Sequence, residues 1–177
     1  MAPRGPARGD EAVEHLKKAI EIAHSAGRQV ALTLSDIACI ASARQSFLDI
    51  IDAGQIDMLF ANENEIKALA GKDGFEDAVA AFQDKVPLMV VTCSEKGAIG
   101  VDKGRRVSIQ AQRIDGVVDT TGAGDLFAAG FLAGQVQCRP LEERLQMGAI
   151  AAAEVISHFG ARPEGDLKAL VEEGLRP

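Results

Sequence analysis

Apolar residues along this chain follow a helical period in some stretches and form short continuous runs in others. In the helical stretches they recur about every 3.6 residues, with Asp10 and Gly27 bounding the first stretch as a favoured N-cap and a favoured helix stop. Helices are predicted on this basis over residues 10–27, 36–54, 63–70 and 78–82. The first half of the chain is therefore expected to contain four helices.

Short apolar runs separate these helices, at residues 29–34, 57–61 and 88–92. A strand that is apolar along its whole length buries both of its sides, so these runs indicate a parallel sheet covered by helices on both faces. Residues 98–101 and 107–111 flank a turn at Asp102, Lys103 and Gly104, which indicates an antiparallel hairpin. The predicted fold class is α/β, with a mostly parallel sheet and one appended hairpin.

The rest of the chain is predicted to be helical apart from one short strand at Val117 and Val118. The predicted helices cover residues 124–136, 141–159 and 166–173, and their many Ala and Gly residues indicate close packing. Residues 1–9, rich in Pro, Gly and Arg, are expected to form a flexible leader to a single domain over residues 10–177.

Composition narrows the class of protein. With 177 residues, 47% hydrophobic and 25% charged, the chain is of the size and balance of one soluble domain. A net charge of −7 and the lack of any Lys and Arg run argue against nucleic acid as the main partner. No apolar run approaches the roughly 20 residues of a membrane helix. Three scattered cysteines suggest neither a disulfide framework nor a zinc site, so a reducing cytoplasm is expected.

The segment Asp119-Thr-Thr-Gly-Ala-Gly-Asp125 leads into a predicted helix and carries the most chemistry. The first amides of a helix attract anions, and Gly122, Ala123 and Gly124 would let the backbone approach a phosphate closely. A carboxylate there, Asp125, is suited to accept a proton from a hydroxyl that attacks phosphorus. Alternatively, Asp125 simply favours the positive end of the helix dipole and the glycines only form the turn. The residues alone leave both interpretations open.

Two common nucleotide-binding motifs are absent from the sequence. The pattern G-x-x-x-x-G-K-[ST] does not occur, and G-x-G-x-x-G fails because Phe127 occupies its last position. A dinucleotide-binding fold would also need a strand soon after this helix, whereas the following residues are predicted to be helical.

Residues 119–125, followed by Leu-Phe-Ala-Ala-Gly-Phe131, resemble the C-terminal signature of the ribokinase-like PfkB family of carbohydrate and nucleoside kinases. The resemblance implies that Asp125 is the catalytic base and that Gly122, Ala123 and Gly124 form an anion hole for the transferred phosphoryl group. It also implies a three-layer α/β/α fold of the ribokinase type, and ATP with Mg²⁺ as the phosphoryl donor.

Two upstream segments resemble further motifs of the family. Asn62 and Glu65 match an N-x-x-E motif, in which Asn approaches phosphate and Glu holds Mg²⁺ through water; the same spacing also makes a capping box that needs no ligand. The segment from Thr92 to Gly97 resembles a T-x-G-x-x-G turn that lies against the nucleotide. Ser94 replaces the usual Gly and tolerates positive φ less well, so Thr92 and Gly97 are the better candidates for nucleotide contact.

The end of the chain resembles the family's last long helix, whose small residues admit the adenine ring. Gly148, Ala149 and Ala152 occupy those positions, although a face rich in Ala is also typical of close helix packing.

Some members of the family bind a monovalent cation such as K⁺ beside the anion hole. By position its ligands here would be Asp119 and Thr121, together with backbone near Gly160 and Ala161.

Residues 32–36 and 157–163 resemble the adenosine kinase-like branch, so the implied substrate is a sugar or nucleoside such as ribose or adenosine. The family's N-terminal half, with its Gly-Gly motif, sugar-binding residues and lid, has no counterpart in the sequence. The chain is therefore expected to be truncated, to expose an edge strand, and to be weak or inactive alone. Self-association or a complementing N-terminal half is the expected partner. Alternatives are a non-catalytic nucleotide-binding or interaction module and a Rossmann-type oxidoreductase.

Overall fold

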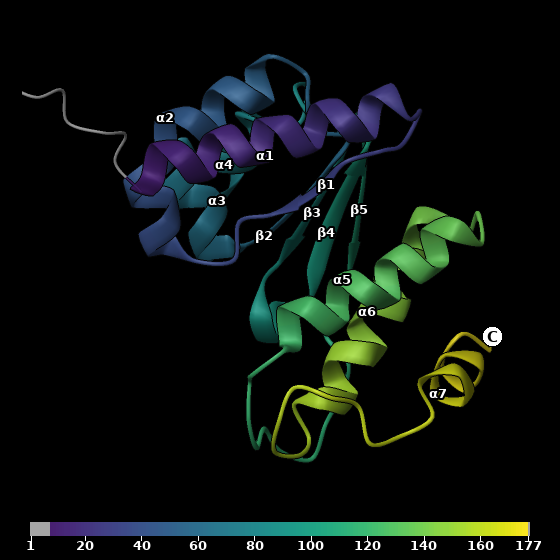
Figure 1. The fold of residues 1–177 in the computed structure, drawn as a ribbon. Coiled ribbons are helices and arrows are strands. Elements are labelled where there is room, and N and C mark those ends of the chain that lie inside the picture. The colour runs from purple at the N-terminus through teal and green to yellow at the C-terminus, as the bar shows by residue number, and fades with distance from the viewer. Residues whose placement is uncertain (1–7, 177) are drawn as a thin grey trace, which may run out of the picture. The chain divides into compact units, whose positions relative to one another are not determined.

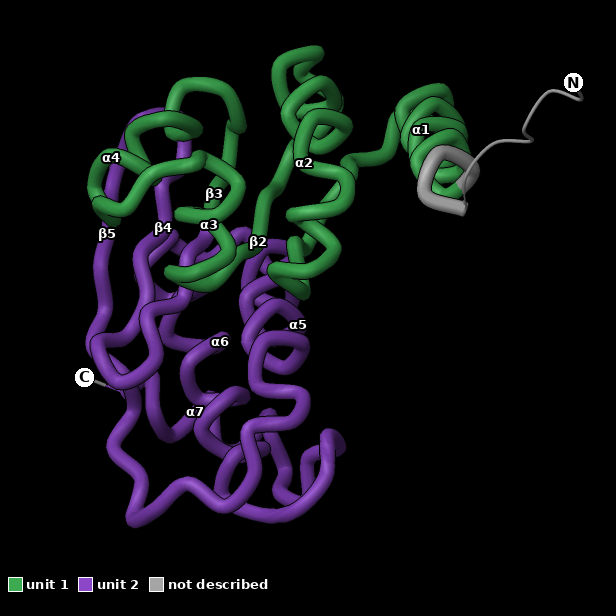
Figure 2. Tube along the Cα trace, turned by 90° about the vertical axis from the view of Figure 1, so that its left-hand side faces the viewer, with its two compact units in different colours: residues 1–89 green, residues 90–177 purple. Residues whose placement is uncertain are grey.

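The computed structural model describes residues 8–176, and the chain divides into two compact units between Met89 and Val90 (Figure 2). Most of the leader expected over residues 1–9 lies outside the described residues, and a helix begins at Arg8. The strands are β1 (Ala31–Thr33), β2 (Met58–Asn62), β3 (Leu88–Thr92), β4 (Ala98–Asp102) and β5 (Arg105–Ile109), hydrogen-bonded in the order β1-β2-β3-β4-β5 (Figure 1).

Seven α-helices and one 3₁₀ turn accompany the strands within residues 8–176. The helices are α1 (Arg8–Ser25), α2 (Ile37–Asp52), α3 (Glu63–Ala70), α4 (Phe75–Ala80), α5 (Ala123–Val136), α6 (Leu141–Val155) and α7 (Leu167–Gly174), and the 3₁₀ turn is η1 (Ser94–Lys96). None of the described helices is both long and apolar enough to cross a membrane.

The first unit contains α1 to α4 with β1 and β2, which pair in parallel with Ala31 opposite Met58. The apolar run of β2 is buried along its length except at Asn62, as expected for a strand covered on both sides. By contrast, Ala31 and Thr33 of β1 are exposed, and β1 stands at the end of the strand order. The expected exposed edge strand is therefore present.

The second unit holds the predicted hairpin. β4 and β5 pair antiparallel, with Asp102 opposite Arg105. The two turn residues between them, Lys103 and Gly104, both have positive φ, at 51° and 80°. Positive φ at both central residues suits the right-handed twist of a two-residue hairpin. The hairpin prediction is confirmed.

Helices α5 and α6 pack directly against each other in the second unit (Figure 1). A Cβ atom at Gly130 would lie 2.5 Å from the Met147 carbonyl oxygen, and one at Gly148 would lie 2.7 Å from the Phe127 carbonyl oxygen. Such contacts are too short for any side chain, so glycine is what allows the two backbones to approach. The close packing predicted from the small residues is confirmed.

Two predicted elements differ from the structure. Val117 and Val118 form no strand: their side chains are 59% and 47% exposed, and Val118 N–H makes a single backbone bond, to Ile156 O at 2.8 Å. Two apolar residues with one such bond do not make a ladder. The helix predicted to end at residue 159 ends at Val155, because the apolar residue that extends its period, Phe159, is 81% exposed instead of packed.

Candidate active site

The segment 119–125, named here the signature turn, ends at the N-terminus of α5. Gly122 is the N-cap of this helix, with φ of +83° and no side-chain hydrogen bond to the first turn. A Cβ atom on Gly122 would lie 2.8 Å from the Ala161 Cβ atom. Glycine is therefore required at this position both by its backbone conformation and by its neighbour.

The first turn of α5 presents two backbone amides without acceptors. Ala123 N–H donates to Thr120 O at 3.2 Å, and the helical ladder begins with Leu126 N–H donating to Gly122 O at 2.8 Å. Within residues 8–176, the N–H groups of Gly124 and Asp125 have no hydrogen-bond acceptor. Gly124 is exposed, and a Cβ atom there would meet no described atom within 4 Å beyond its chain neighbours and the backbone of its own helix. An anion can therefore reach these amides, which carry the positive end of the helix dipole.

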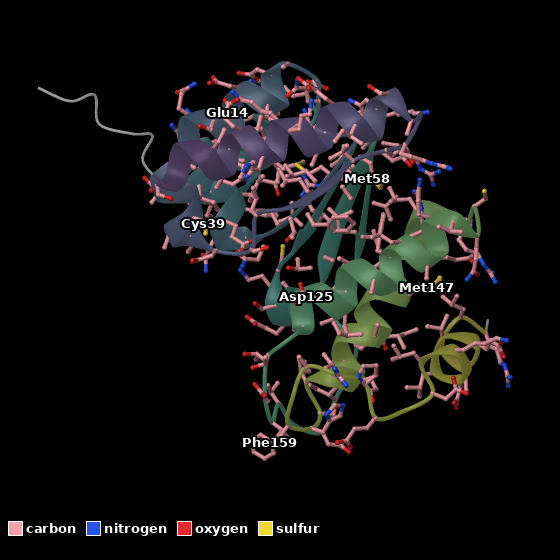
Figure 3. The ribbon with its side chains drawn as sticks, in the orientation of Figure 1. Glu14, Cys39, Met58, Asp125, Met147 and Phe159 are labelled. Carbon is pink, nitrogen blue, oxygen red and sulfur yellow. The ribbon has the colours of Figure 1, made fainter. Side chains whose placement is uncertain are left out.

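Asp125 lies in this first turn with its side chain exposed (Figure 3). Its carboxylate and one of the open amides belong to the same residue, so the base and the anion site are adjacent by covalent structure. Burial of Asp125 in packed protein would have excluded a role as a base, and the structure does not bury it. Its role as catalytic base remains a prediction.

Asp119 holds the start of the signature turn in place. Its Oδ1 atom accepts hydrogen bonds from the Thr121 hydroxyl at 2.7 Å and from Thr121 N–H at 2.9 Å, while Oδ2 accepts from Gly160 N–H at 3.1 Å. The Thr121 hydroxyl, then the amides of Thr121 and Gly160, lower the pKa of Asp119 below its usual value. An ionised Asp119 thus links the signature turn to the loop that follows α6.

This link brings together the residues implied for a monovalent cation. Asp119, Thr121 and Gly160 are joined by hydrogen bonds, and Ala161 packs beside Gly122. Carboxylate, hydroxyl and carbonyl oxygens are the ligands that hard cations prefer, so the residues present fit such an ion. The cation site remains a prediction.

Glu154, in the last turn of α6, is a residue that the sequence analysis did not single out. Its Oε1 atom accepts hydrogen bonds from Gly165 N–H at 2.6 Å, Glu164 N–H at 2.8 Å and the His158 ring at 3.3 Å. Burial raises the pKa of Glu154, but these hydrogen bonds, led by Gly165 and Glu164, outweigh burial and lower it. The spacing of Glu154 and His158 is visible in the sequence, whereas the amides ten and eleven residues away are set by the path of the loop.

Among the residues implied for nucleotide binding, Gly97 needs to be glycine for structural reasons, whether or not a nucleotide binds there. A Cβ atom there would lie 2.0 Å from the Ile109 carbonyl oxygen, and φ is +96°. Ser94 adopts φ of +51° although serine tolerates positive φ less well than glycine. Thr92 ends β3 and is half-buried. The nucleotide contacts of these three residues remain predictions.

The small residues of α6 divide into two groups. Gly148 packs on Phe127 of α5, so helix packing accounts for it. Ala149 is buried and Ala152 is half-buried, and their contact with adenine remains a prediction.

Asn62 and Glu65 belong to the first unit and form a complete capping box at the start of α3. Glu65 N–H donates to Asn62 Oδ1 and Asn62 N–H donates to Glu65 Oε2, both at 2.9 Å. Glu65 is only 6% exposed. The capping interpretation therefore holds in this structure, and the phosphate and Mg²⁺ roles remain predictions.

Comparison with protein families identifies the family to which this chain belongs. Residues 10–166 match the pfkB family of carbohydrate kinases, and the chain belongs to this family. The recognised resemblance and the expected α/β fold of the ribokinase type are thereby confirmed.

Particular relatives include both nucleoside and sugar kinases. The crystal structure of adenosine kinase from Sinorhizobium meliloti superposes with a TM-score of 0.86 at 40% identity, covering 95% of this chain and 50% of that one. The ribokinase of Arabidopsis thaliana, solved with ribose and ATP, gives a TM-score of 0.70 at 27% identity over 89% of this chain and 52% of that one. A cytidine kinase of Thermococcus kodakarensis is 35% identical over 108 residues, which are 60% of this chain and 39% of that one. The chain thus spans about half the length of these solved relatives.

Proposed function

We propose that this chain is the ATP-handling part of a kinase that transfers the γ-phosphoryl group of ATP to a hydroxyl of a sugar or nucleoside. The observation that carries the proposal is the exposed Asp125 carboxylate beside two open amides at the start of α5. Family membership supports it, and so do the names of the relatives, which include adenosine, cytidine and ribose kinases.

In the proposed reaction the backbone of Gly122, Ala123 and Gly124 surrounds the migrating phosphoryl group. Because Ala123 N–H already donates to Thr120 O, the amides of Gly124 and Asp125 are the ones available to bind its oxygens. The Asp125 carboxylate accepts the proton of the attacking hydroxyl, which typically contributes about 10²–10⁴ in rate.

The ATP bound to the Arabidopsis ribokinase supports ATP as the donor. We assign adenine and ribose contacts to Thr92, Ser94, Gly97, Ala149 and Ala152. Asn62 would approach the phosphates, and Glu65 would orient Mg²⁺ through water after its capping bond to Asn62 loosens. Bound Mg²⁺ would neutralise the phosphate charge, and K⁺ would bind at Asp119 and Thr121.

The acceptor is proposed to be adenosine or ribose, and the reaction to take place in the cytoplasm. Phosphoryl transfer depends on positioning the acceptor, and this chain matches only about half of its solved relatives. We therefore expect the 177-residue chain to bind MgATP weakly and to turn over little or nothing alone. A complementing N-terminal half would restore turnover.

Asp125→Asn tests the proposal. We would measure MgATP binding by calorimetry, and phosphorylation of adenosine and ribose in the presence of a fragment covering the unmatched half of the Sinorhizobium enzyme. Asn cannot accept the proton, so turnover should fall by about 10²-fold or more while MgATP binding persists. Removing a negative charge beside the phosphates should leave MgATP affinity unchanged or tighter.

Asp84→Asn is the matched control, since Asp84 is exposed in the first unit and the substitution changes the charge equally. It should alter neither binding nor turnover. If Asp125→Asn has no more effect than Asp84→Asn on a complemented, active sample, the base assignment is wrong. MgATP binding with no turnover in any complemented sample would favour a non-catalytic nucleotide-binding module instead.

A further inference from the structure

The loop after α6 forms the support behind the signature turn. We name residues 156–165 the back loop. Its Ile156 carbonyl accepts the Val118 amide at 2.8 Å, and its Gly160 amide donates to Asp119 at 3.1 Å. These bonds hold the two segments together just before the amides that the proposed reaction uses. The position of the back loop therefore sets the position of the signature turn.

Ala161 of the back loop also limits the space around the N-cap of α5. The Cα atom of Ala161 lies 3.0 Å, and its carbonyl oxygen 3.2 Å, from where a Cβ atom of Gly122 would be. A shift of the back loop would therefore change the space in which Gly122 adopts its positive φ.

The far end of the back loop is fastened by a single side chain of α6. Glu154 accepts the amides of Glu164 and Gly165 at 2.8 and 2.6 Å, and its side chain is 10% exposed. The same oxygen accepts the His158 ring nitrogen at 3.3 Å, inside the loop. One carboxylate oxygen thus gathers three donors from the loop.

Helix α6 is held closely against α5, because the two helices pack through glycines. The contacts of Gly130 and Gly148 leave no room for the two helices to approach further. Since α5 starts at the signature turn, an anchor on α6 fixes the back loop relative to the amides of Gly124 and Asp125.

We propose that Glu154 is a positioning residue for the anion site: by holding residues 164 and 165 against α6, it keeps the back loop in the place from which Gly160 and Ala161 fix the signature turn. Within residues 8–176, the hydrogen bonds of Glu154 go to the back loop and not to Gly124 or Asp125, so it acts through the loop. The inference rests on the proposed function for its consequence in nucleotide binding, but its structural part stands on the contacts alone.

The test compares Glu154→Ala with Glu142→Ala in the full chain. Glu142 is an exposed glutamate in the first turn of the same helix, which makes it a matched control. Hydrogen exchange by mass spectrometry would follow peptides from residues 119–125, 156–165 and 98–109, and calorimetry would follow MgATP binding.

For Glu154→Ala we expect exchange to rise in the back loop and also in the signature turn, with the β4–β5 hairpin unchanged. MgATP affinity should fall on the order of tenfold, a coupling within the range of residues that share one hydrogen-bonded network. Glu154→Gln keeps an oxygen that can accept both amides, so it should restore most of the protection and affinity. Glu142→Ala should change nothing.

Faster exchange confined to the back loop, with the signature turn as protected as in wild type, would overturn the proposal. The proposal would also be overturned if the signature turn exchanged hydrogen as fast in Glu154→Gln as in Glu154→Ala. If Glu154→Ala does not fold, Glu154→Asp gives the same comparison, because its shorter side chain withdraws the oxygen from the two amides. If wild type fails to bind MgATP, the proposed function fails for this chain, while the exchange measurements still decide the role of Glu154.

Discussion

Gly122 and Gly124 stand two residues apart in the signature turn, yet a side chain would meet different surroundings at each. At Gly122 it would meet Ala161, on a backbone with φ of +83°. At Gly124 it would meet no described atom within 4 Å beyond its chain neighbours and the backbone of α5. The two positions therefore separate the structural need for glycine from its use in admitting a ligand.

We predict that Gly122→Ala lowers the free energy of unfolding by about 1–3 kcal/mol, because strained backbone and a close contact add together. Gly124→Ala should leave that free energy unchanged or raise it by up to about 1 kcal/mol, as alanine favours the helix. Urea denaturation measures both. Equal losses at the two positions would contradict this account of the turn.

Gly124→Ala should nevertheless weaken MgATP binding, since its methyl group would stand beside the open amides of the first turn. Loss of binding without loss of stability would mark Gly124 as a position where glycine serves the ligand.

Single residues also show where sequence reasoning reached its limit. The resemblance brought Asp119, Thr121 and Gly160 into one expected site, and the structure joins them by hydrogen bonds. Glu154 could not be found this way, because its amide partners depend on how residues 156–165 turn back. By contrast, the glycine usual at the position of Ser94 pointed to positive φ there, and Ser94 has φ of +51°.

At the scale of elements, two glycines of the β4–β5 hairpin share positive φ but differ in their neighbours. A Cβ atom at Gly97 would lie 2.0 Å from the Ile109 carbonyl oxygen, whereas one at Gly104 would meet no described atom within 4 Å. The hairpin therefore has space for a side chain at its tip, at Gly104, but not at its base, at Gly97.

Gly97→Ala should destabilise the chain by more than about 3 kcal/mol, since the β5 backbone must move and pairing with β4 must weaken. Gly104→Ala should cost only about 1–2 kcal/mol, the backbone strain alone. Thermal and urea unfolding would compare the two variants. Similar costs would show that conformational strain, and not the close backbone contact, explains Gly97.

Elements with signals at both ends were predicted best. Residues 63–70 were expected as a helix and form α3. The capping box at Asn62 marks its start, and Gly71, with its left-handed backbone, marks its end. The prediction of a strand at residues 117–118 was wrong, since two adjacent apolar residues do not indicate whether a partner strand lies beside them. The predicted end of α6 was wrong because the apolar period of the sequence continues to Phe159, whose side chain is exposed in the structure (Figure 3).

For the whole molecule, the exposed side of β1 is the feature most open to association. β1 ends the strand order, with Ala31 and Thr33 exposed. An unpaired strand edge can pair with another chain, and a charged side chain on it discourages such pairing. The resemblance to the family led us to expect both the fold and an exposed edge strand, and β1 is such a strand.

We predict that the purified chain self-associates as its concentration rises and that Ala31→Lys shifts it toward monomer. Sedimentation velocity at several concentrations would measure this. Ala80→Lys, at an exposed position of α4, adds the same charge away from the strand and should leave association unchanged. A wild-type chain that stays monomeric throughout would refute the prediction.

Asp125 contributes an amide from its backbone and a carboxylate from its side chain to the same site. A few covalent bonds, and not the packing of distant parts, therefore keep the proposed proton acceptor next to the proposed phosphate binder. Under the proposed function, a chain that turns over little because the acceptor alcohol is poorly positioned would still have its carboxylate and its phosphate-binding amide correctly placed. A partner surface that binds the alcohol would then be enough to restore turnover, with no change to Asp125 or the signature turn.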